Sequence, residues 1–151
     1  MRLLLDTNVV VDYLGNREPF CKPARLLMIA GKVGEFELWI SASQVSDLIY
    51  ILSNGGKKTL MPQVSHIIEA LLDFVNVFAA GKDELVAALH AGWDDPEDAI
   101  IHAVALKLKA DAIITRNGDD FSKSLVPVMD CEEFFSWLEG KDMSYEELAW
   151  V

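Results

Sequence analysis

The stretch Arg2-Leu3-Leu4-Leu5-Asp6-Thr7-Asn8 decides the predicted fold. Its three leucines follow one another without polar alternation, which is typical of a parallel strand that helices cover on both faces. Asp6, Thr7 and Asn8 then offer capping side chains for a helix that ends near Gly15. We therefore expect Asp6 at the carboxyl end of the first strand, where its carboxylate either caps the helix or faces a crevice.

Strands and helices alternate along the rest of the chain. The residue pattern predicts strands at 38–40, 75–77, 112–115 and 126–128. It predicts helices at about 23–30, 62–72, 84–90, 96–108 and 131–138, a helix that Ser41 or Ser43 caps and that runs to about Leu52, and a last short helix opening at Ser144. Gly31 is expected to end the first of these helices.

This order favours an α/β fold, with a three-layer α/β/α arrangement around a mostly parallel central sheet. We expect a single domain over residues 1–139 and an acidic C-terminal extension over residues 140–151. In such sheets, functional side chains gather at the carboxyl ends of the strands.

The composition is that of an acidic globular protein. The chain has 151 residues, 52% of them hydrophobic and 25% charged, so it can bury a core and is a poor candidate for intrinsic disorder. Its 13 Lys and Arg stand against 24 Asp and Glu, which gives a net charge of −11. This balance argues against a broad basic surface for nucleic acid. Much of the acid excess is interpreted as a solvated surface.

We expect a cytoplasmic protein that has no membrane segment. The first residues hold too few apolar side chains for a signal peptide, and no stretch is long enough to cross a bilayer. Cys21 and Cys131 have no Cys or His partner at metal-finger spacing, so they are interpreted as reduced, structural thiols. His102 is expected to pack in the interior.

Two acids interrupt apolar helical patterns. Asp47 lies in a predicted helix that is apolar nearly all round, and a carboxylate buried there would be costly unless a cation or hydrogen bonds compensate. Asp98 follows the helix-start signal Asp94-Asp95-Pro96 and lies at the edge of a buried stripe. An exposed or capping role is the alternative for each.

A fourth acidic segment, Thr115-Arg116-Asn117-Gly118-Asp119-Asp120-Phe121, follows the fourth predicted strand. It makes a plain turn, or it brings one or two carboxylates to the same sheet edge as Asp6. Clustered carboxylates repel one another, so they must take up protons or hold cations, and oxygen ligands favour Mg²⁺ or Mn²⁺. A metal-dependent nuclease is therefore the natural candidate.

These segments, taken in order, resemble PIN-domain proteins, the metal-dependent ribonuclease fold that includes VapC-like toxins. The matching residues run over about 2–138 and comprise Leu5-Asp6-Thr7-Asn8, Asn16-Arg17-Glu18-Pro19-Phe20, Ile40-Ser41-Ala42-Ser43, Asp47-Leu48-Ile49-Tyr50, Glu97-Asp98-Ala99, Ile114-Thr115-Arg116-Asn117, Asp120-Phe121, Val126-Pro127-Val128 and Glu132-Glu133-Phe134. The resemblance implies cleavage of single-stranded RNA with Mg²⁺ or Mn²⁺.

The resemblance also implies roles for particular residues. Metal-binding and catalytic carboxylates are implied at Asp6, Asp47, Asp98 and Asp120, with Asp119 as the alternative fourth acid. Hydrogen-bonding support is implied from Asn8, Thr115 and Asn117, although Asn117 stands where some members have Asp. Candidate contacts to RNA phosphates are Arg17, Lys57, Lys58 and Arg116, each of which has an ordinary surface charge as its alternative role.

Partners and rival functions follow from the same comparison. The resemblance implies a small antitoxin as a partner and a homodimer as a candidate assembly, for which Trp137, Tyr145 and Trp150 offer aromatic surface. One rival is a PIN-like module that binds RNA or an antitoxin with little or no catalysis. Another is a phosphatase of the HAD type with Asp6 as nucleophile, which would require a second acid where this chain has Asn8.

Overall fold

Five parallel strands form the centre of the computed structural model, which describes residues 1–141. The strand order is β3-β2-β1-β4-β5, so the first strand of the chain lies in the middle. Their bounds are Arg2–Leu5 for β1, Glu37–Ser41 for β2, Val75–Phe78 for β3, Ala112–Ile114 for β4 and Val128–Met129 for β5. Leu4 pairs with Trp39 on one side and with Ile113 on the other.

Seven α-helices and two 3₁₀-helices in the described residues surround this sheet. The α-helices are α1 Thr7–Leu14, α2 Cys21–Lys32, α3 Ala42–Leu52, α4 Met61–Leu72, α5 Lys82–His90, α6 Pro96–Leu108 and α7 Cys131–Glu139. The 3₁₀-helices are η1 Lys58–Leu60 and η2 Gly118–Phe121. The predicted three-layer α/β/α fold is thereby confirmed, and the sheet is parallel at every pairing.

The alternating directions of the β1 side chains divide the core into two layers. Leu3 and Leu5 pack with residues of α1, α2, α3, α4 and α7 on one face. Leu4 packs on the other face against α6, where Val104 and Ala105 are fully buried. Because both faces are covered, the uninterrupted leucine run of β1 is the pattern expected for a central parallel strand.

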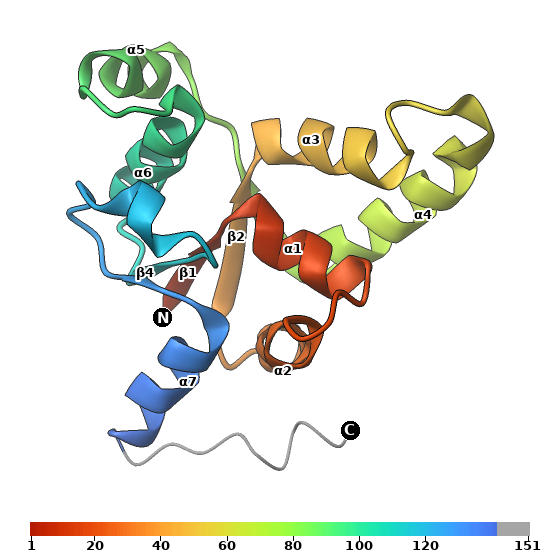
Figure 1. The fold of residues 1–151 in the computed structure, drawn as a ribbon, viewed down its shortest axis with the longest axis horizontal. Coiled ribbons are helices and arrows are strands. Elements are labelled where there is room, and N and C mark those ends of the chain that lie inside the picture. The colour runs from red at the N-terminus through yellow and green to blue at the C-terminus, as the bar shows by residue number, and fades with distance from the viewer. Residues whose placement is uncertain (142–151) are drawn as a thin grey trace.

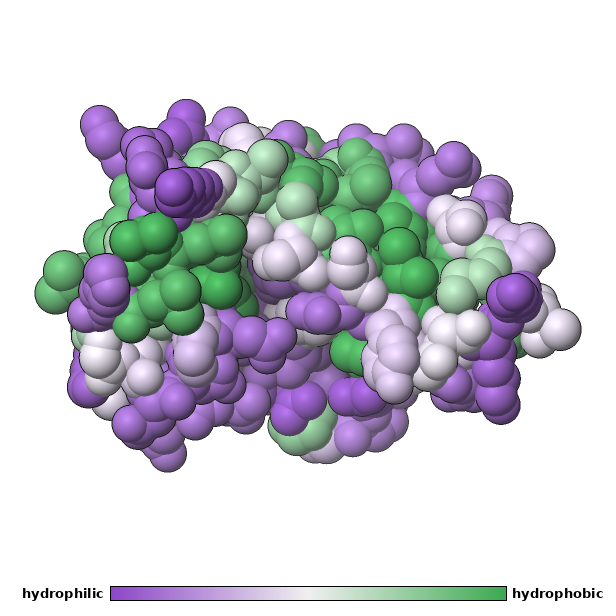
Figure 2. All heavy atoms as spheres, turned by 90° about the horizontal axis from the view of Figure 1, so that it is seen from above, coloured by the Kyte–Doolittle hydropathy of each residue, from purple (hydrophilic) through white to green (hydrophobic). Residues whose placement is uncertain are grey.

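The carboxyl ends of β1 and β2 point to the same edge of the sheet, between α3 and α6 (Figure 1). Seen from above, this edge carries a hydrophilic band between two hydrophobic areas, one on the side of α5 and one over α3 (Figure 2). The fold thus leaves a polar opening where the central strands end, in agreement with the expected position of a site.

Two details differ from the sequence prediction. Gly31 is the second-to-last residue of α2, which ends one residue later, at Lys32. Leu38 of β2 packs against Gly31, and a Cβ there would overlap the Leu38 side chain. The fifth strand begins at Val128 rather than at Val126. The Ser124 hydroxyl bonds both the carbonyl oxygen and the amide of Val126, and this local turn takes the place of the start of the strand.

The chain end is only partly described. The structure describes the chain as far as Lys141, two residues beyond the end of α7, so the helix expected from Ser144, together with Tyr145 and Trp150, lies outside the described residues. Within residues 1–141, no helix is both long and apolar enough to cross a membrane.

Candidate active site

Asp6 lies at the junction of β1 and α1 and is 8% exposed. Its amide donates to the carbonyl oxygen of Ile114, which holds it beside the end of β4. Its Oδ1 accepts a hydrogen bond of 2.7 Å from the Thr7 amide, and its Oδ2 accepts one of 2.7 Å from the Thr115 hydroxyl. Asp6 therefore caps α1 and also faces the end of the neighbouring strand, so the two roles considered for it coexist.

Asn8 and Thr115 complete a hydrogen-bonded cluster around Asp6. The Asn8 side-chain amide donates to Asp6 Oδ2 and to Thr115 Oγ1, both at 3.2 Å. The Arg116 amide donates to Asn8 Oδ1 at 3.3 Å, and the Asn117 amide donates to Thr115 Oγ1 at 3.1 Å. Asn8 and Thr115 thus meet Asp6 through their side chains, whereas Asn117 takes part through its backbone.

Asp98 lies in the first turn of α6, where Asp95 caps the helix by accepting a hydrogen bond of 2.8 Å from the Glu97 amide. Burial, followed by the negative charges of Asp95, Asp6, Asp120 and Glu97, raises the pKa of Asp98 to about 7. Burial also raises the pKa of Asp6, with a further rise from Asp120, while the hydrogen bonds from Thr115 and Thr7 oppose it. Carboxylates from three separate segments therefore repel one another across this edge.

The fourth acidic segment forms η2, and its two candidate acids differ in their coupling to the others. Asp120 acts electrostatically on both Asp6 and Asp98. Asp119 is not among the charges that shift either pKa, although it lines a small cavity of about 90 Å³ together with Asp120 and Asp98. The coupling favours Asp120 over Asp119 as the fourth acid.

Asp47 lines a larger cleft of about 440 Å³ between α3 and α6. Asp6, Asp98 and Glu97 line the same cleft, and so do Thr7, Ser43, Gln44, Tyr50, Ile51, Ile100 and Ile101. The sequence argument for Asp47 was wrong in one respect: α3 is not buried nearly all round, because Tyr50 and Ile51 are exposed and Asp47 is exposed with them. Asp98 lines both this cleft and the small cavity, so it lies between Asp47 and Asp120.

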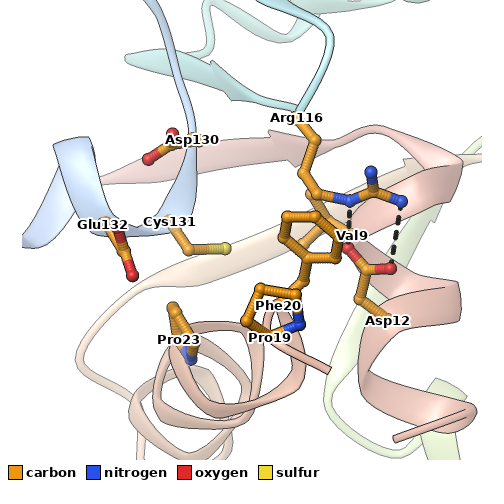
Figure 3. A pocket seen from close by; sticks show the side chains of 9 residues that line it. All are labelled: Val9, Asp12, Pro19, Phe20, Pro23, Arg116, Asp130, Cys131 and Glu132. Atoms are coloured by element: carbon orange, nitrogen blue, oxygen red, sulfur yellow. Dashed lines mark hydrogen bonds and ion pairs between the residues drawn. The ribbon is translucent and has the colours of Figure 1, made fainter. Parts of the chain in front are cut away.

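The four basic residues considered as phosphate contacts do not line the acidic cleft. Arg17, Lys57 and Lys58 are exposed elsewhere on the described surface. Arg116 instead makes a two-pronged ion pair with Asp12 of α1, and its guanidinium lies 4.1 Å from the ring centroid of Phe20 (Figure 3). These residues line a separate cavity of about 200 Å³, which Cys131 and Glu132 of the α7 N-terminus close on the opposite side.

Sequence reasoning missed two polar residues that hold this region together. Asp12 is 1% exposed and pairs with Arg116, so it is the buried helical carboxylate that the apolar pattern had indicated for Asp47. Gln44 is buried at the start of α3, where its amide donates to the Leu5 carbonyl oxygen at 2.8 Å and its Oε1 accepts from the Ser41 amide. The Ser41-x-x-Gln44 capping box was the available signal for Gln44.

The interior roles expected for His102 and the cysteines agree with the structure. His102 is buried, accepts a hydrogen bond from the Leu125 amide at 3.1 Å and stacks on Trp93 with a ring-centroid distance of 4.9 Å. Burial lowers its pKa, which keeps the ring neutral as an acceptor. Cys21 and Cys131 are both buried and free.

The chemistry available at this edge is that of oxygen donors. Among residues 1–141, no three acidic, His or Cys side chains are close enough to form a complete set of metal ligands. The carboxylates nevertheless interact through their charges. No Lys or Arg lines the cleft that Asp6, Asp47 and Asp98 share, whereas Lys123 lines the small cavity of Asp98 and Asp120, and the charge of Arg116 lowers the pKa of Asp6. A divalent cation that favours oxygen ligands is the group that such a set of donors suits.

Comparison with known proteins agrees with this arrangement. The family model described as PIN domain matches residues 2–119. The structure of VapBC-1 from nontypeable Haemophilus influenzae is similar, with 22% identity, 87% of this chain and 99% of that chain covered, and a TM-score of 0.63. FitAcB from Neisseria gonorrhoeae shows 17% identity, 86% and 98% coverage and a TM-score of 0.67.

A third similar structure is VapBC2 from Rickettsia felis bound to a DNA fragment from the promoter, with 17% identity, 86% and 98% coverage and a TM-score of 0.64. No curated protein matches the sequence. At these identities the three structures support the fold, and the family match covers the segments that carry Asp6, Asp47 and Asp98.

Proposed function

Because the chain belongs to the PIN-domain family, we propose that it is a metal-dependent endoribonuclease that hydrolyses phosphodiester bonds of single-stranded RNA. The observation that carries this proposal is that Asp6, Asp47 and Asp98 line one cleft at the carboxyl edge of the sheet, while Asp98 and Asp120 together line the adjoining cavity. Carboxylates that lie close together at such an edge repel one another and favour a bound cation.

The cation we propose is Mg²⁺ or Mn²⁺, held by Asp6, Asp98 and Asp120, with Asp47 orienting a water or a second ligand position. The donor chemistry fits, since all four residues offer carboxylate oxygens, and no Lys or Arg lines the cleft that Asp6, Asp47 and Asp98 share. A bound divalent cation would lower the pKa of a water molecule and offset charge on the scissile phosphate.

The chain's own residues prepare this site in two ways. Thr115 and Asn8 fix the Asp6 carboxylate in one orientation, because both side chains donate to its Oδ2. Gln44 bonds both the Leu5 carbonyl oxygen and the Ser41 amide, which fixes the start of α3 next to Asp6 and so sets the separation of Asp47 from Asp6. Ligands held by a second layer of hydrogen bonds are the usual design of such centres.

The test combines binding with cleavage. Calorimetry with Mn²⁺ at pH 7.5 should show binding to the wild type and a loss of at least about tenfold in affinity for Asp98→Asn. A panel of end-labelled single-stranded RNAs should be cut in Mn²⁺ or Mg²⁺, and EDTA or Asp6→Asn should abolish the cuts. Glu139→Gln, an exposed acid at the end of α7, is the matched control and should leave both readouts unchanged. The proposal would be refuted if pure wild-type protein neither bound Mn²⁺ nor cleaved any RNA of the panel.

We further propose that the enzyme acts in the cytoplasm as the toxin of a toxin–antitoxin pair and forms a homodimer. This proposal is supported by the PIN-domain match and by the fold that the chain shares with VapBC-1, with FitAcB and with a toxin–antitoxin complex from Klebsiella pneumoniae. Expression of the wild type should arrest bacterial growth, and co-expression of a small reading frame that precedes its gene should restore growth. Growth arrest that persists in Asp6→Asn would separate toxicity from nuclease activity and contradict this role.

A further inference from the structure

The acidic cleft has an apolar wall, formed by Tyr50 and Ile51 of α3 and Ile100 and Ile101 of α6. Tyr50 is 65% exposed, compared with 41% for Phe20 and 37% for Trp137, two other exposed aromatic residues of the described chain. It follows Asp47 by three residues, so the two side chains share one face of α3. Tyr50 and Ile51 are exposed, whereas Ile100 is partly buried and Ile101 is buried, so the isoleucines of α6 form the base of the wall. Exposed apolar side chains directly beside a set of carboxylates are unexpected if solvation is their only purpose.

The charges in the cleft leave a question about RNA affinity. RNA binding normally draws on Lys and Arg that neutralise phosphates, yet the described lining residues include Asp6, Asp47, Glu97 and Asp98 and no basic side chain. Bound metal can hold the phosphate at the reaction centre, but it offers no contact to the flanking nucleotides. Lys123 lines the adjoining small cavity but not this cleft, so an interaction that does not depend on charge is the means of holding the strand that the cleft itself offers.

Stacking of a base on an aromatic side chain is such an interaction, because it does not depend on charge. The cleft, at about 440 Å³, falls in the size range of pockets that hold small organic ligands. The Tyr50 hydroxyl lies beside Gly55: a Cβ added to this glycine would be 3.6 Å from the hydroxyl oxygen. The tip of the ring therefore lies against the turn after α3. The ring is supported at its tip while most of the residue remains exposed.

We propose that this apolar wall is a nucleobase-binding subsite, in which a base next to the scissile phosphate leaves its stack and packs on Tyr50, flanked by the isoleucines. The inference rests on the proposed function, because it gives that function its means of holding a single strand. A duplex keeps its bases paired and stacked, so the subsite selects unpaired RNA.

A double-mutant cycle tests the subsite without cleavage as the readout. Binding of a labelled single-stranded RNA is measured by fluorescence anisotropy with Ca²⁺ in place of Mg²⁺, and the same strand carrying abasic sites serves as the second probe. Tyr50→Ala should weaken binding of the intact strand by about tenfold and leave the abasic strand unaffected. Tyr50→Phe should bind the intact strand within about twofold of the wild type, since it keeps the ring.

Leu89→Ala is the matched control variant. Leu89 of α5 is 66% exposed, almost the same as Tyr50, and does not line the cleft. It should bind both strands as the wild type does. Equal losses for the intact and abasic strands, or equal effects of Tyr50→Ala and Leu89→Ala, would overturn the subsite.

Two further measurements separate failure of the subsite from failure of the nuclease. Metal-free protein is titrated with adenosine and, for comparison, with ribose, while backbone amide NMR signals are followed. Adenosine alone should shift signals of α3 and α6, and Tyr50→Ala should remove the shifts; this result stands even if no RNA is cut. Metal-dependent cleavage whose KM is unchanged in Tyr50→Ala would leave the nuclease intact and refute the subsite.

The remaining explanation for exposed Tyr50 is contact with a second copy of the chain. Size-exclusion chromatography of the wild type and Tyr50→Ala decides this point. The subsite predicts the same elution volume for both proteins, and dissociation of a dimer by Tyr50→Ala would overturn it.

Discussion

The Thr115 hydroxyl donates a 2.7 Å hydrogen bond to Asp6 Oδ2 and thereby joins the ends of β4 and β1. Both side chains are buried, so neither can exchange this bond freely for one with water. Replacing Thr115 with Val keeps the shape of the side chain and removes the donor.

Thr115→Val is expected to destabilise the protein by about 2 kcal/mol, because a buried carboxylate loses a charge-assisted hydrogen bond. It should also weaken Mn²⁺ binding, since Asp6 loses one of the contacts that orient it and its pKa rises further. Urea unfolding and calorimetry measure the two effects. Thr115→Ser retains the hydroxyl and should recover most of the Mn²⁺ affinity; if it does not, the methyl group rather than the hydrogen bond is responsible.

The pKa of Asp98 predicts a pH dependence of stability. Its pKa is about 7 in the folded protein, whereas an unperturbed Asp titrates near pH 4. The folded state therefore holds this proton more tightly, and the contribution of Asp98 to the free energy of unfolding is present below pH 4 and is lost as the pH rises to 7.

Asp98→Asn removes that dependence. In EDTA, the variant should match the wild type near pH 4 and be more stable at pH 8 by about 1 kcal/mol, a value reduced for the solvent that reaches this half-exposed carboxyl. Urea unfolding across the pH range measures the difference. A difference between the two proteins that does not change with pH would contradict the coupling of the acids.

The Arg116–Asp12 pair is predicted to stabilise the fold rather than to bind RNA. Asp12 is almost fully buried, so Arg116→Met leaves an uncompensated carboxylate and should reduce the free energy of unfolding by about 3 kcal/mol. The double variant Asp12→Leu/Arg116→Met should recover much of this loss. Arg17→Met, at an exposed position, should change stability by less than about 0.5 kcal/mol. Urea unfolding compares the variants, and equal losses for Arg17→Met and Arg116→Met would contradict the role of the pair.

Gly31 is predicted to be required by the packing of Leu38. Gly31→Ala gains helix propensity, yet its methyl group would overlap Leu38, so a net loss of about 1–3 kcal/mol is expected. Combining it with Leu38→Val, which shortens the neighbouring side chain, should produce a smaller loss than the sum of the two single variants. Thermal unfolding measures the cycle, and additive losses would show that the contact is not the cause.

The sequence predicts the fold well because its signals are local. The leucines of β1 and the helix-start signal before α6 each specify an element without reference to distant residues. The meeting of Asp6 with Thr115 was also predictable, since the carboxyl ends of parallel strands share one edge of the sheet.

Features that depend on which faces pack together could not be predicted in the same way. A helical pattern alone does not show which apolar stripe stays exposed. Asp47 of α3 was therefore interpreted as a buried acid, whereas it is exposed, and Asp12 of α1 is a buried helical acid instead. Gly31 looks like a simple helix end in the sequence. Its packing against Leu38 could not be predicted, because Leu38 belongs to another element, β2. Asp119 and Asp120 are adjacent, and only their coupling to Asp6 and Asp98 distinguishes them.

The central position of β1 delays completion of the acidic site until β4 has been synthesised. Thr115, which orients Asp6, lies 109 residues further along the chain and is therefore synthesised much later. Until β4 has been synthesised, β1 also has an open edge on that side. A nascent or prematurely terminated chain that stops short of β4 therefore cannot assemble the site.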